Sequence, residues 1–325
     1  MDRRAFLGAL AGGLIAAPLA AEAQPVGKVR RVAYLSLAAG PSPRSEALEQ
    51  GLRELGYVVG QNIAVEYRWA AGDLGRARAA AADLVHSNVD VIVTGGPQAT
   101  RVAKEATTTT PIVMAVDYDP AGAGFIASLA RPGGNITGLS SLNPELSGKR
   151  LSLLKEILPG ITRVAVLWNP LEPNAATYWR ETRLAARAIG VQPQSWEVRV
   201  PRDLERAVRE AKRERDNAFT VLTDPVTLYH RVELADLVAK HHLPAIYSER
   251  LFVEAGGLMS YGANDREMHR HAAVFVDKIL RGEKPADLPV EQPTTYELVL
   301  NLKTAKALGL TIPPSLLQRA DQILE

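Results

Sequence analysis

The 325-residue chain contains no cysteine. This absence excludes disulfide bonds, thiolate metal sites, a cysteine nucleophile and a lipid-modified cysteine at an export cleavage site. A protein without disulfides must rely on its hydrophobic core for stability. The chain is long enough to build one, because 325 residues suffice for a large single domain or for two lobes of ordinary size.

An excess of charge of one sign is also missing. The 38 lysines and arginines nearly balance 36 aspartates and glutamates, so the net charge is +2. This charge gives no electrostatic case for a nucleic-acid partner, and we expect none. The most basic stretch, residues 199–215, alternates its arginines with acidic residues, which is typical of a solvated helix face.

Long apolar runs are absent except at the N-terminus, which reads MDRRAFLGALAGGLIAAPLAAEAQP. A charged start, an apolar middle and the small residues at Ala21-Glu22-Ala23 predict a signal peptide over residues 1–23 and a periplasmic location. The pair Arg3-Arg4 fits a twin-arginine export signal and equally an ordinary secretory signal. A membrane anchor is disfavoured, because the run is short and is broken by glycines and a proline.

Enzyme signatures are missing as well. The chain has no Gly-x-Ser-x-Gly elbow, no His-Glu-x-x-His motif and no triad spacing, so we predict neither catalysis nor a cofactor. Asp117-x-Asp119 resembles a metal-binding pair, although Asp119-Pro120 equally predicts a helix start. One alternative therefore stays open, an exported enzyme in which Asp117, Asp119 and Asp224 hold a divalent metal.

What the chain does contain is a regular alternation of β-type and helical runs. Residues 31–37 and 89–93 have buried-strand patterns, and residues 45–55 and 73–85 have helical ones. The run at 89–93 shows no polar alternation, so both of its faces are buried, as in parallel sheets covered by helices. The order predicts doubly wound α/β architecture.

The second half of the chain repeats the first. Residues 31–36 (RVAYLS) align with 163–168 (RVAVLW), an offset of 163 − 31 = 132, and Asp73-Leu74 aligns with Asp203-Leu204, an offset of 130. The shared order predicts two Rossmann-like lobes with parallel sheets. The join at residues 129–145 is rich in Gly, Pro, Ser and Asn and is either a hinge or a surface turn.

Late β-type runs at 257–261 and 289–300 cannot all belong to the second lobe if the repeat is real, so the chain crosses between lobes more than once. We expect lobe 1 to comprise residues 28–141 and 257–286. Lobe 2 is then expected to comprise residues 142–256 and 287–325.

The stretch VDVIVTGGPQAT, residues 89–100, ends a strand in two glycines before a helix. In open parallel sheets, ligands bind beyond the carboxyl ends of the strands. Gly95 and Gly96 let the backbone approach a ligand, and the following helix start suits an anion such as a carboxylate. A tight turn without a ligand is the alternative. The stretch is neither a dinucleotide fingerprint nor a P-loop.

The corresponding loop of lobe 2, Thr223-Asp224-Pro225, carries a carboxylate instead of glycines. A zwitterionic ligand would place its carboxylate on lobe 1 and its ammonium near Asp224. Asp224 equally fits a helix N-cap with Pro225 at the first helical position, and both roles can coexist. Aromatic residues at other strand ends, such as Trp168 and Tyr247, offer flat apolar surfaces to a ligand.

With these residues in hand, the chain resembles the ABC-transporter substrate-binding proteins of the tryptophan/tyrosine-type group over nearly the whole mature chain. The stretches that carry the resemblance are GLRELGY (51–57), GQNI (60–63), VIVTGG (91–96), SLARPGGNITG (128–138), ELSGKR (145–150), VAVLWNP (164–170), FVEAGGLMSYG (252–262) and NLKTAKALGLTIPP (301–314).

The resemblance implies a type I periplasmic binding fold with two lobes, three crossovers and a ligand enclosed in the cleft. It also implies an amino-acid-like or small carboxylate ligand and delivery to an ABC permease in the inner membrane. Where members of the group often have Gly-Asp-Pro, this chain has Asp117-Tyr118-Asp119-Pro120, so we expect Tyr118 to narrow the ligand range. The cleft-lining residues carried over from the group are Ser36, Thr94, Gly95, Gly96, Asp117, Trp168, Asn169, Asp224 and Tyr247.

We therefore expect a monomeric periplasmic substrate-binding protein of an ABC importer that closes on a small molecule by hinge bending. The ligand is expected to be amino-acid-like or an aromatic carboxylate. Two alternatives remain at this point, the exported metal-dependent enzyme and a ligand-sensing partner of a membrane receptor.

Overall fold

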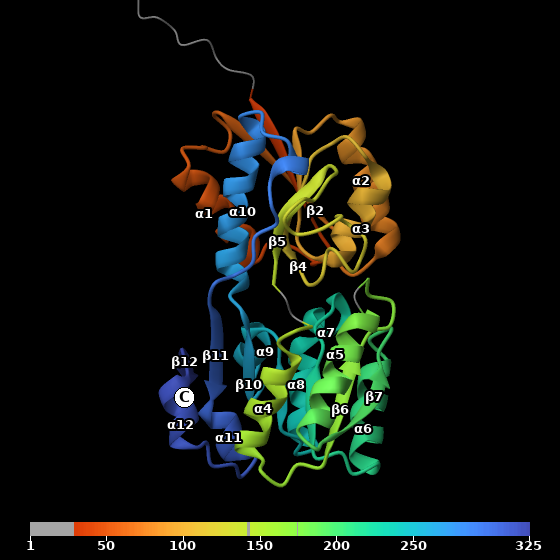
Figure 1. Cartoon of the computed structure of the whole chain (residues 1–325), viewed down its shortest axis with the longest axis vertical. Helices are drawn as coiled ribbons and strands as arrows, with labels where there is room; N and C mark the ends of the chain where they lie inside the picture. The colour runs from red at the N-terminus through yellow and green to blue at the C-terminus, as the bar shows by residue number, and fades with distance from the viewer. Residues whose placement is uncertain (1–28, 142–143, 174) are drawn as a thin grey trace, which may run out of the picture.

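The computed structural model describes residues 29–141, 144–173 and 175–325. The predicted signal peptide, with its twin-arginine pair, lies outside the described residues. The described chain forms two lobes arranged end to end, with several segments of the chain passing between them (Figure 1). Among the described residues, no helix has the length and apolar character needed to span a membrane.

Lobe 1 is built on a five-stranded parallel sheet in the order β2-β1-β3-β4-β5. Its strands are β1 (Arg30–Ser36), β2 (Ile63–Trp69), β3 (Val91–Thr94), β4 (Ile112–Asp117) and β5 (Ile136–Ser140). One face is covered by α1 (Pro43–Glu54) and α10 (Asp265–Leu280), and the other by α2 (Leu74–His86) and α3 (Pro97–Ala106).

The alternation of side chains along a strand explains these two covered faces. Val32 and Tyr34 of β1 join the core beneath α1 and α10, whereas Ala33 and Leu35 join the core beneath α2 and α3. All four are buried, as the pattern at 31–37 predicted. In the run 89–93, Val91 and Val93 join the first core and Ile92 the second, so the predicted burial on both faces is confirmed.

Lobe 2 is built on a seven-stranded sheet in the order β12-β11-β10-β9-β8-β6-β7. All neighbours are parallel except β10 and β11, which pair antiparallel. The strands are β6 (Arg163–Trp168), β7 (Gln192–Glu197), β8 (Ala218–Val221), β9 (Ala245–Tyr247), β10 (Met259–Ala263), β11 (Tyr296–Asn301) and β12 (Gln322–Leu324).

Helices cover both faces of this second sheet as well. On one face lie α4 (Ser147–Ile157), α5 (Ala175–Ala188), α11 (Leu302–Ala307) and α12 (Pro314–Arg319). On the other face lie α6 (Asp203–Arg213), α8 (Arg231–Lys240) and α9 (Arg250–Glu254). Two short helices complete the chain, α7 (Pro225–Tyr229) and the 3-10 helix η1 (Pro285–Asp287).

The chain passes between the lobes after β5, between β10 and α10, and between η1 and β11. The lobe boundaries predicted from sequence differ from these positions. Strand β10 pairs with β9 and β11 in lobe 2, although the boundary at residue 257 assigned it to lobe 1. Conversely, Leu288 and Val290 pack in the cores of lobe 1, beyond the predicted boundary at residue 286. Hydrophobic periodicity identifies a strand but not the sheet that it joins.

Helix α10 completes lobe 1 although it is far from α1 in the sequence. The two helices lie side by side (Figure 1), and Gly51 of α1 faces the backbone of α10. A Cβ atom at Gly51 would lie 2.2 Å from the Arg270 carbonyl oxygen and 2.9 Å from the Ala273 Cβ. The absence of a side chain at Gly51 therefore allows this close packing.

We expect Gly51→Ala to lower the free energy of unfolding by about 1–3 kcal/mol, because the added methyl forces α1 and α10 apart. Gly148→Ala in α4 is the matched control, because its Cβ would meet only the Ala185 Cβ, at an ordinary 3.6 Å. The control should be unchanged, or more stable by up to about 1 kcal/mol through helix propensity. Urea denaturation of both variants measures this difference, and equal stabilities would contradict the packing argument.

Candidate ligand-binding site

A cavity of about 260 Å³ lies between the lobes, beyond the carboxyl ends of strands from both sheets. Lobe 1 contributes the segment after β1, the Gly95–Ala99 segment after β3, and Tyr118 after β4. Lobe 2 contributes Asp224 with the residues of α7, and Leu251 of α9. This is the position at which open parallel sheets bind ligands, and the volume suits a small molecule.

Three helices begin at this cavity, and each has a proline at its first position. They are α1 at Pro43, α3 at Pro97 and α7 at Pro225. The start of α7 is capped by the Asp224 side chain, whereas α3 follows Gly96, which has no side chain to cap it. The first turn of α3 therefore presents the positive end of its backbone dipole to the cavity, and Gln98 in this turn donates to the carboxylate of Glu172.

Gly95 lets two hydroxyl groups reach the lobe 1 wall of the cavity. A Cβ atom there would lie 2.5 Å from Tyr34 Oη and 3.2 Å from Ser36 Oγ. Both Tyr34 and Ser36 line the cavity. Gly96 has a φ of +143°, a conformation that favours glycine. Gly95 thus allows the two hydroxyl groups to approach the backbone, and Gly96 allows the tight turn before α3.

Behind this wall, Tyr34 Oη lies 3.1 Å from Nε2 of the buried His269 in α10. His269 Nδ1 lies 2.7 Å from the Asp265 carbonyl oxygen, which can only accept, so Nδ1 carries the proton and Nε2 accepts from Tyr34. Burial, reinforced by Arg44, lowers the pKa of His269 to about 4. The cavity wall and the start of α10 are thereby linked through a neutral imidazole.

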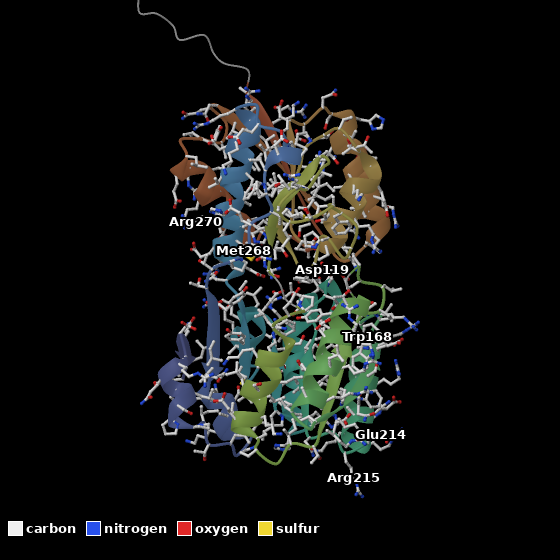
Figure 2. The ribbon with its side chains drawn as sticks, viewed as in Figure 1. Asp119, Trp168, Glu214, Arg215, Met268 and Arg270 are labelled. Atoms are coloured by element: carbon white, nitrogen blue, oxygen red, sulfur yellow. The ribbon has the colours of Figure 1, made fainter. Side chains whose placement is uncertain are left out.

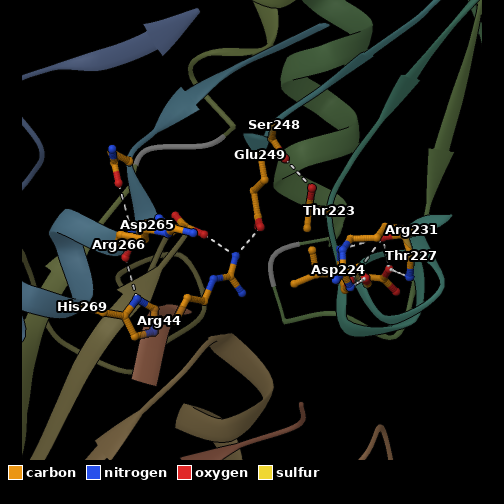
Figure 3. Close-up of polar contacts among 12 residues, drawn as sticks. Arg44, Thr223, Asp224, Thr227, Arg231, Ser248, Glu249, Asp265, Arg266 and His269 are labelled. Carbon is orange, nitrogen blue, oxygen red and sulfur yellow. Dashed lines mark hydrogen bonds and ion pairs between the residues drawn. The ribbon is translucent and has the colours of Figure 1, made fainter. Parts of the chain in front are cut away.

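Asp224 has both of the roles that its sequence context allows. Its Oδ1 accepts hydrogen bonds from the Thr227 backbone N–H at 2.7 Å and from the Thr227 hydroxyl (Figure 3). Its Oδ2 accepts from Asn169 Nδ2 at 2.6 Å. The N-cap interpretation is confirmed. Asp224 also borders the cavity. Burial raises the pKa of Asp224.

Four of the residues expected on the cleft wall line this cavity, namely Ser36, Gly95, Gly96 and Asp224. Trp168 and Asn169 instead border another cavity of only about 10 Å³, and Tyr118 lines both this cavity and the larger one. Figure 2 shows Trp168 in lobe 2 and Asp119 at the edge of lobe 1 that faces it. The Trp168 ring stacks on Trp179, with centroids 5.8 Å apart.

Three expected residues do not line the cavity. Thr94 is buried and its hydroxyl pairs with Thr100 Oγ1 at 2.9 Å, so it holds the start of α3. Asp117 is fully buried and accepts from the Tyr118 N–H at 2.8 Å. The expectation for Tyr247 is wrong, because its ring stacks on Phe252 in the core of lobe 2, with centroids 4.7 Å apart. A strand end has two faces, and only one of them borders the cleft.

The cavity is also lined by three residues that were not predicted from the sequence, namely Arg44, Gln98 and Tyr34. Arg44 had a detectable signal. It lies in the first turn of α1, where the helix dipole disfavours a cation, so a nearby acidic partner was to be expected. The partners of Arg44 come from segments more than 200 residues away, and no local pattern identifies them.

The acidic residues of the metal-enzyme alternative do not assemble. Within residues 29–141, 144–173 and 175–325, no group of three or more His, Asp or Glu side chains is placed to hold a metal ion. Asp119 instead accepts from the Gly122 N–H at 2.8 Å within a turn, and the helix start predicted at Asp119-Pro120 is wrong, because the described residues between β4 and β5 contain no helix.

Comparisons with known proteins agree on one family. A profile described as ABC transporter substrate binding protein matches residues 40–324. A tyrosine-binding protein of Clostridioides difficile is 26% identical over 262 residues, covering 80% of this chain and 75% of the relative. An ABC domain from Streptococcus pneumoniae, solved in complex with L-Trp, has a TM-score of 0.86 and 27% identity, covering 91% of this chain and 99% of that one. A conserved domain protein from Vibrio cholerae has a TM-score of 0.86 and 29% identity, covering 91% and 100%.

We expect acid to destabilise the protein through His269. Its pKa is about 4 when folded and about 6.5 when unfolded, so below pH 6.5 the unfolded state binds a proton that the folded state does not. The free energy of unfolding should therefore fall as the pH falls from 6.5 to 4, by about 3 kcal/mol relative to His269→Gln. Chemical denaturation of both proteins across this range measures the difference. A difference that stays constant with pH would contradict the assignment of a neutral, buried imidazole.

Proposed function

Because the chain belongs to the ABC transporter substrate binding protein family, which has the type I periplasmic binding fold, we propose that it is the periplasmic binding component of an ABC importer. It captures an amino-acid-like or aromatic carboxylate ligand between its lobes, closes on it by hinge bending and delivers it to a permease as a monomer. The observation that carries this proposal is the cavity between the lobes, which the start of α3 and Arg44 border from lobe 1 and which Asp224 and Arg231 border from lobe 2.

The polarity of the cavity suits a zwitterion. On lobe 1, the uncapped first turn of α3 and the Ser36 hydroxyl receive a carboxylate. On lobe 2, the charge of the Asp224 carboxylate at the cavity wall attracts an ammonium group. We propose Ser36, Gly95, Gly96 and Asp224 as the ligand contacts.

Aromatic side chains on the same walls favour a ligand with a ring. Tyr34 and Tyr118 border the cavity from lobe 1, and Tyr229 borders it from lobe 2. Such rings offer flat apolar surfaces that pack well on another ring. The relatives add support, since one is named for tyrosine and another was solved with L-Trp. Aromatic amino acids are therefore the first ligands to test.

Closure of the lobes is supported by contacts that cross between them. Gln98 of lobe 1 donates to Glu172 of lobe 2, and the rings of Tyr118 and Tyr178 lie 6.4 Å apart. The match to the L-Trp complex covers 91% of this chain at a TM-score of 0.86, which supports a similar placement of the lobes. A hinge of three segments permits such closure without unfolding either core.

The test is thermal unfolding of the mature chain against amino acids, aromatic acids, sugars and divalent metals. A ligand at about a hundred times its dissociation constant should add about 2.7 kcal/mol to the free energy of unfolding. We expect this response from L-tyrosine or L-tryptophan. The proposal fails if no organic ligand gives a shift, and stabilisation by a metal alone, reversed by chelator, would favour the enzyme alternative.

We further expect Gly95→Ala to abolish or strongly weaken this response, because its methyl group displaces Tyr34 Oη and Ser36 Oγ at the cavity wall. Gly134→Ala is the matched control in the same lobe, where a Cβ atom would meet nothing within 4 Å. Isothermal titration of the three proteins with the active ligand compares their affinities. Wild-type affinity in Gly95→Ala would remove this wall from the binding site.

A further inference from the structure

Beside the cavity, one arginine joins three parts of the chain. Arg44 of α1 in lobe 1 forms ion pairs with Glu249, which precedes α9 in lobe 2, and with Asp265, the first residue of α10 (Figure 3). Tyr118 of lobe 1 donates to the other Glu249 oxygen at 3.3 Å. The contact therefore unites lobe 1, lobe 2 and the crossover segment that leads from one to the other.

All three ionised groups are largely removed from solvent. The side chains of Glu249, Arg44 and Asp265 are 5%, 13% and 15% exposed. A buried charge is costly unless it is paired. Burial raises the pKa of Glu249, which Arg44 opposes, and Asp265 raises it further. For Arg44, burial acts to lower the pKa, but Glu249 and Asp265 outweigh it and raise it. The ion pair with Arg44 therefore favours the charged form of the buried Glu249 carboxylate.

Within lobe 2, the Glu249 side chain has no role comparable to its ion pair with Arg44. It occupies the N-cap position of α9 but makes no side-chain capping bond there. Its carboxylate bonds in the described chain go to Arg44 and Tyr118, both on lobe 1. Glu249 is also not among the residues that line the 260 Å³ cavity. A buried carboxylate whose partners lie across the cleft is satisfied only when the lobes are together.

We propose that Glu249 and Arg44 form a latch between the lobes, which stabilises the closed conformation and slows ligand release without any contact between Glu249 and the ligand. That a ligand binds between the lobes and is released rests on the proposed function. The latch itself is a property of the ligand-free protein, because every group in it belongs to the chain.

A latch and a ligand contact have different thermodynamic consequences. A group that acts only on the equilibrium between open and closed forms changes the affinity for every ligand by the same factor. A group that touches the ligand changes the ratio of affinities between two ligands instead, because each ligand presents different atoms to it. The ratio of two affinities therefore distinguishes the two roles.

The test variant is Glu249→Ala, with Glu254→Ala as the matched control. Glu254 lies in the same short helix, and its ion pair with Arg250, at 2.9 Å, stays within lobe 2. Glu249→Gln is a second variant that keeps the side-chain shape, for which we expect a smaller effect in the same direction. Because the chain lacks cysteine, Val58→Cys and Leu184→Cys give one exposed labelling site in each lobe.

Single-molecule energy transfer between these labels measures the ratio of closed to open molecules without ligand. We expect Glu249→Ala to lower this ratio roughly tenfold or more, as for the loss of a buried charge pair, and Glu254→Ala to leave it unchanged. In stopped-flow experiments, dissociation of L-tyrosine and of L-tryptophan should accelerate by one common factor.

Two results would overturn the latch. One is an unchanged closed-to-open ratio in both Glu249 variants. The other is a change in the tyrosine-to-tryptophan affinity ratio, which would make Glu249 a ligand contact. If the wild-type protein binds neither amino acid, the proposed ligand class fails, but the energy-transfer measurement on the ligand-free protein still decides the latch.

Discussion

The packing of α10 against α1 and the lobe 1 sheet is the contact on which the rest of the structure depends. This helix follows the last strand-to-helix crossover from lobe 2, yet Phe275 and Val276 are buried in the lobe 1 core. Its first turn supplies Asp265 to the ion pairs with Arg44, and its second supplies His269 to Tyr34. One helix thus contacts the core of lobe 1, the connection to lobe 2 and the wall of the cavity.

The cleft combines two kinds of residue with separate tasks. The glycines after β3 leave room for a ligand, and the start of α3 provides a positive electrostatic potential there. Charged side chains beside them, chiefly Arg44 and Glu249, meet each other across the cleft. In the proposed closure, these charged residues contribute to binding through the equilibrium between open and closed forms, and the first group contributes through contact with the ligand.

The candidate site was only partly predictable from sequence. Gly95, Gly96 and Asp224 were found because strand-end glycines and a carboxylate before a proline are local signals. Tyr247 follows the same rule but faces the core of lobe 2, since a strand end offers two directions and sequence does not select one. Glu249 lies between a short strand and a five-residue helix and carries no local signal, because its partner Arg44 is 205 residues away.

By itself, the sequence determined the elements and their repetition: buried parallel strands, helices between them, and two lobes of similar order, because hydrophobic period and turn residues act locally. Only the tertiary structure decided which lobe each late segment completes. Strand β10 and helix α10 are separated by a single residue, Asn264, yet they belong to different lobes. That choice depends on which apolar face each segment covers, and the residues forming that face are supplied by distant parts of the chain.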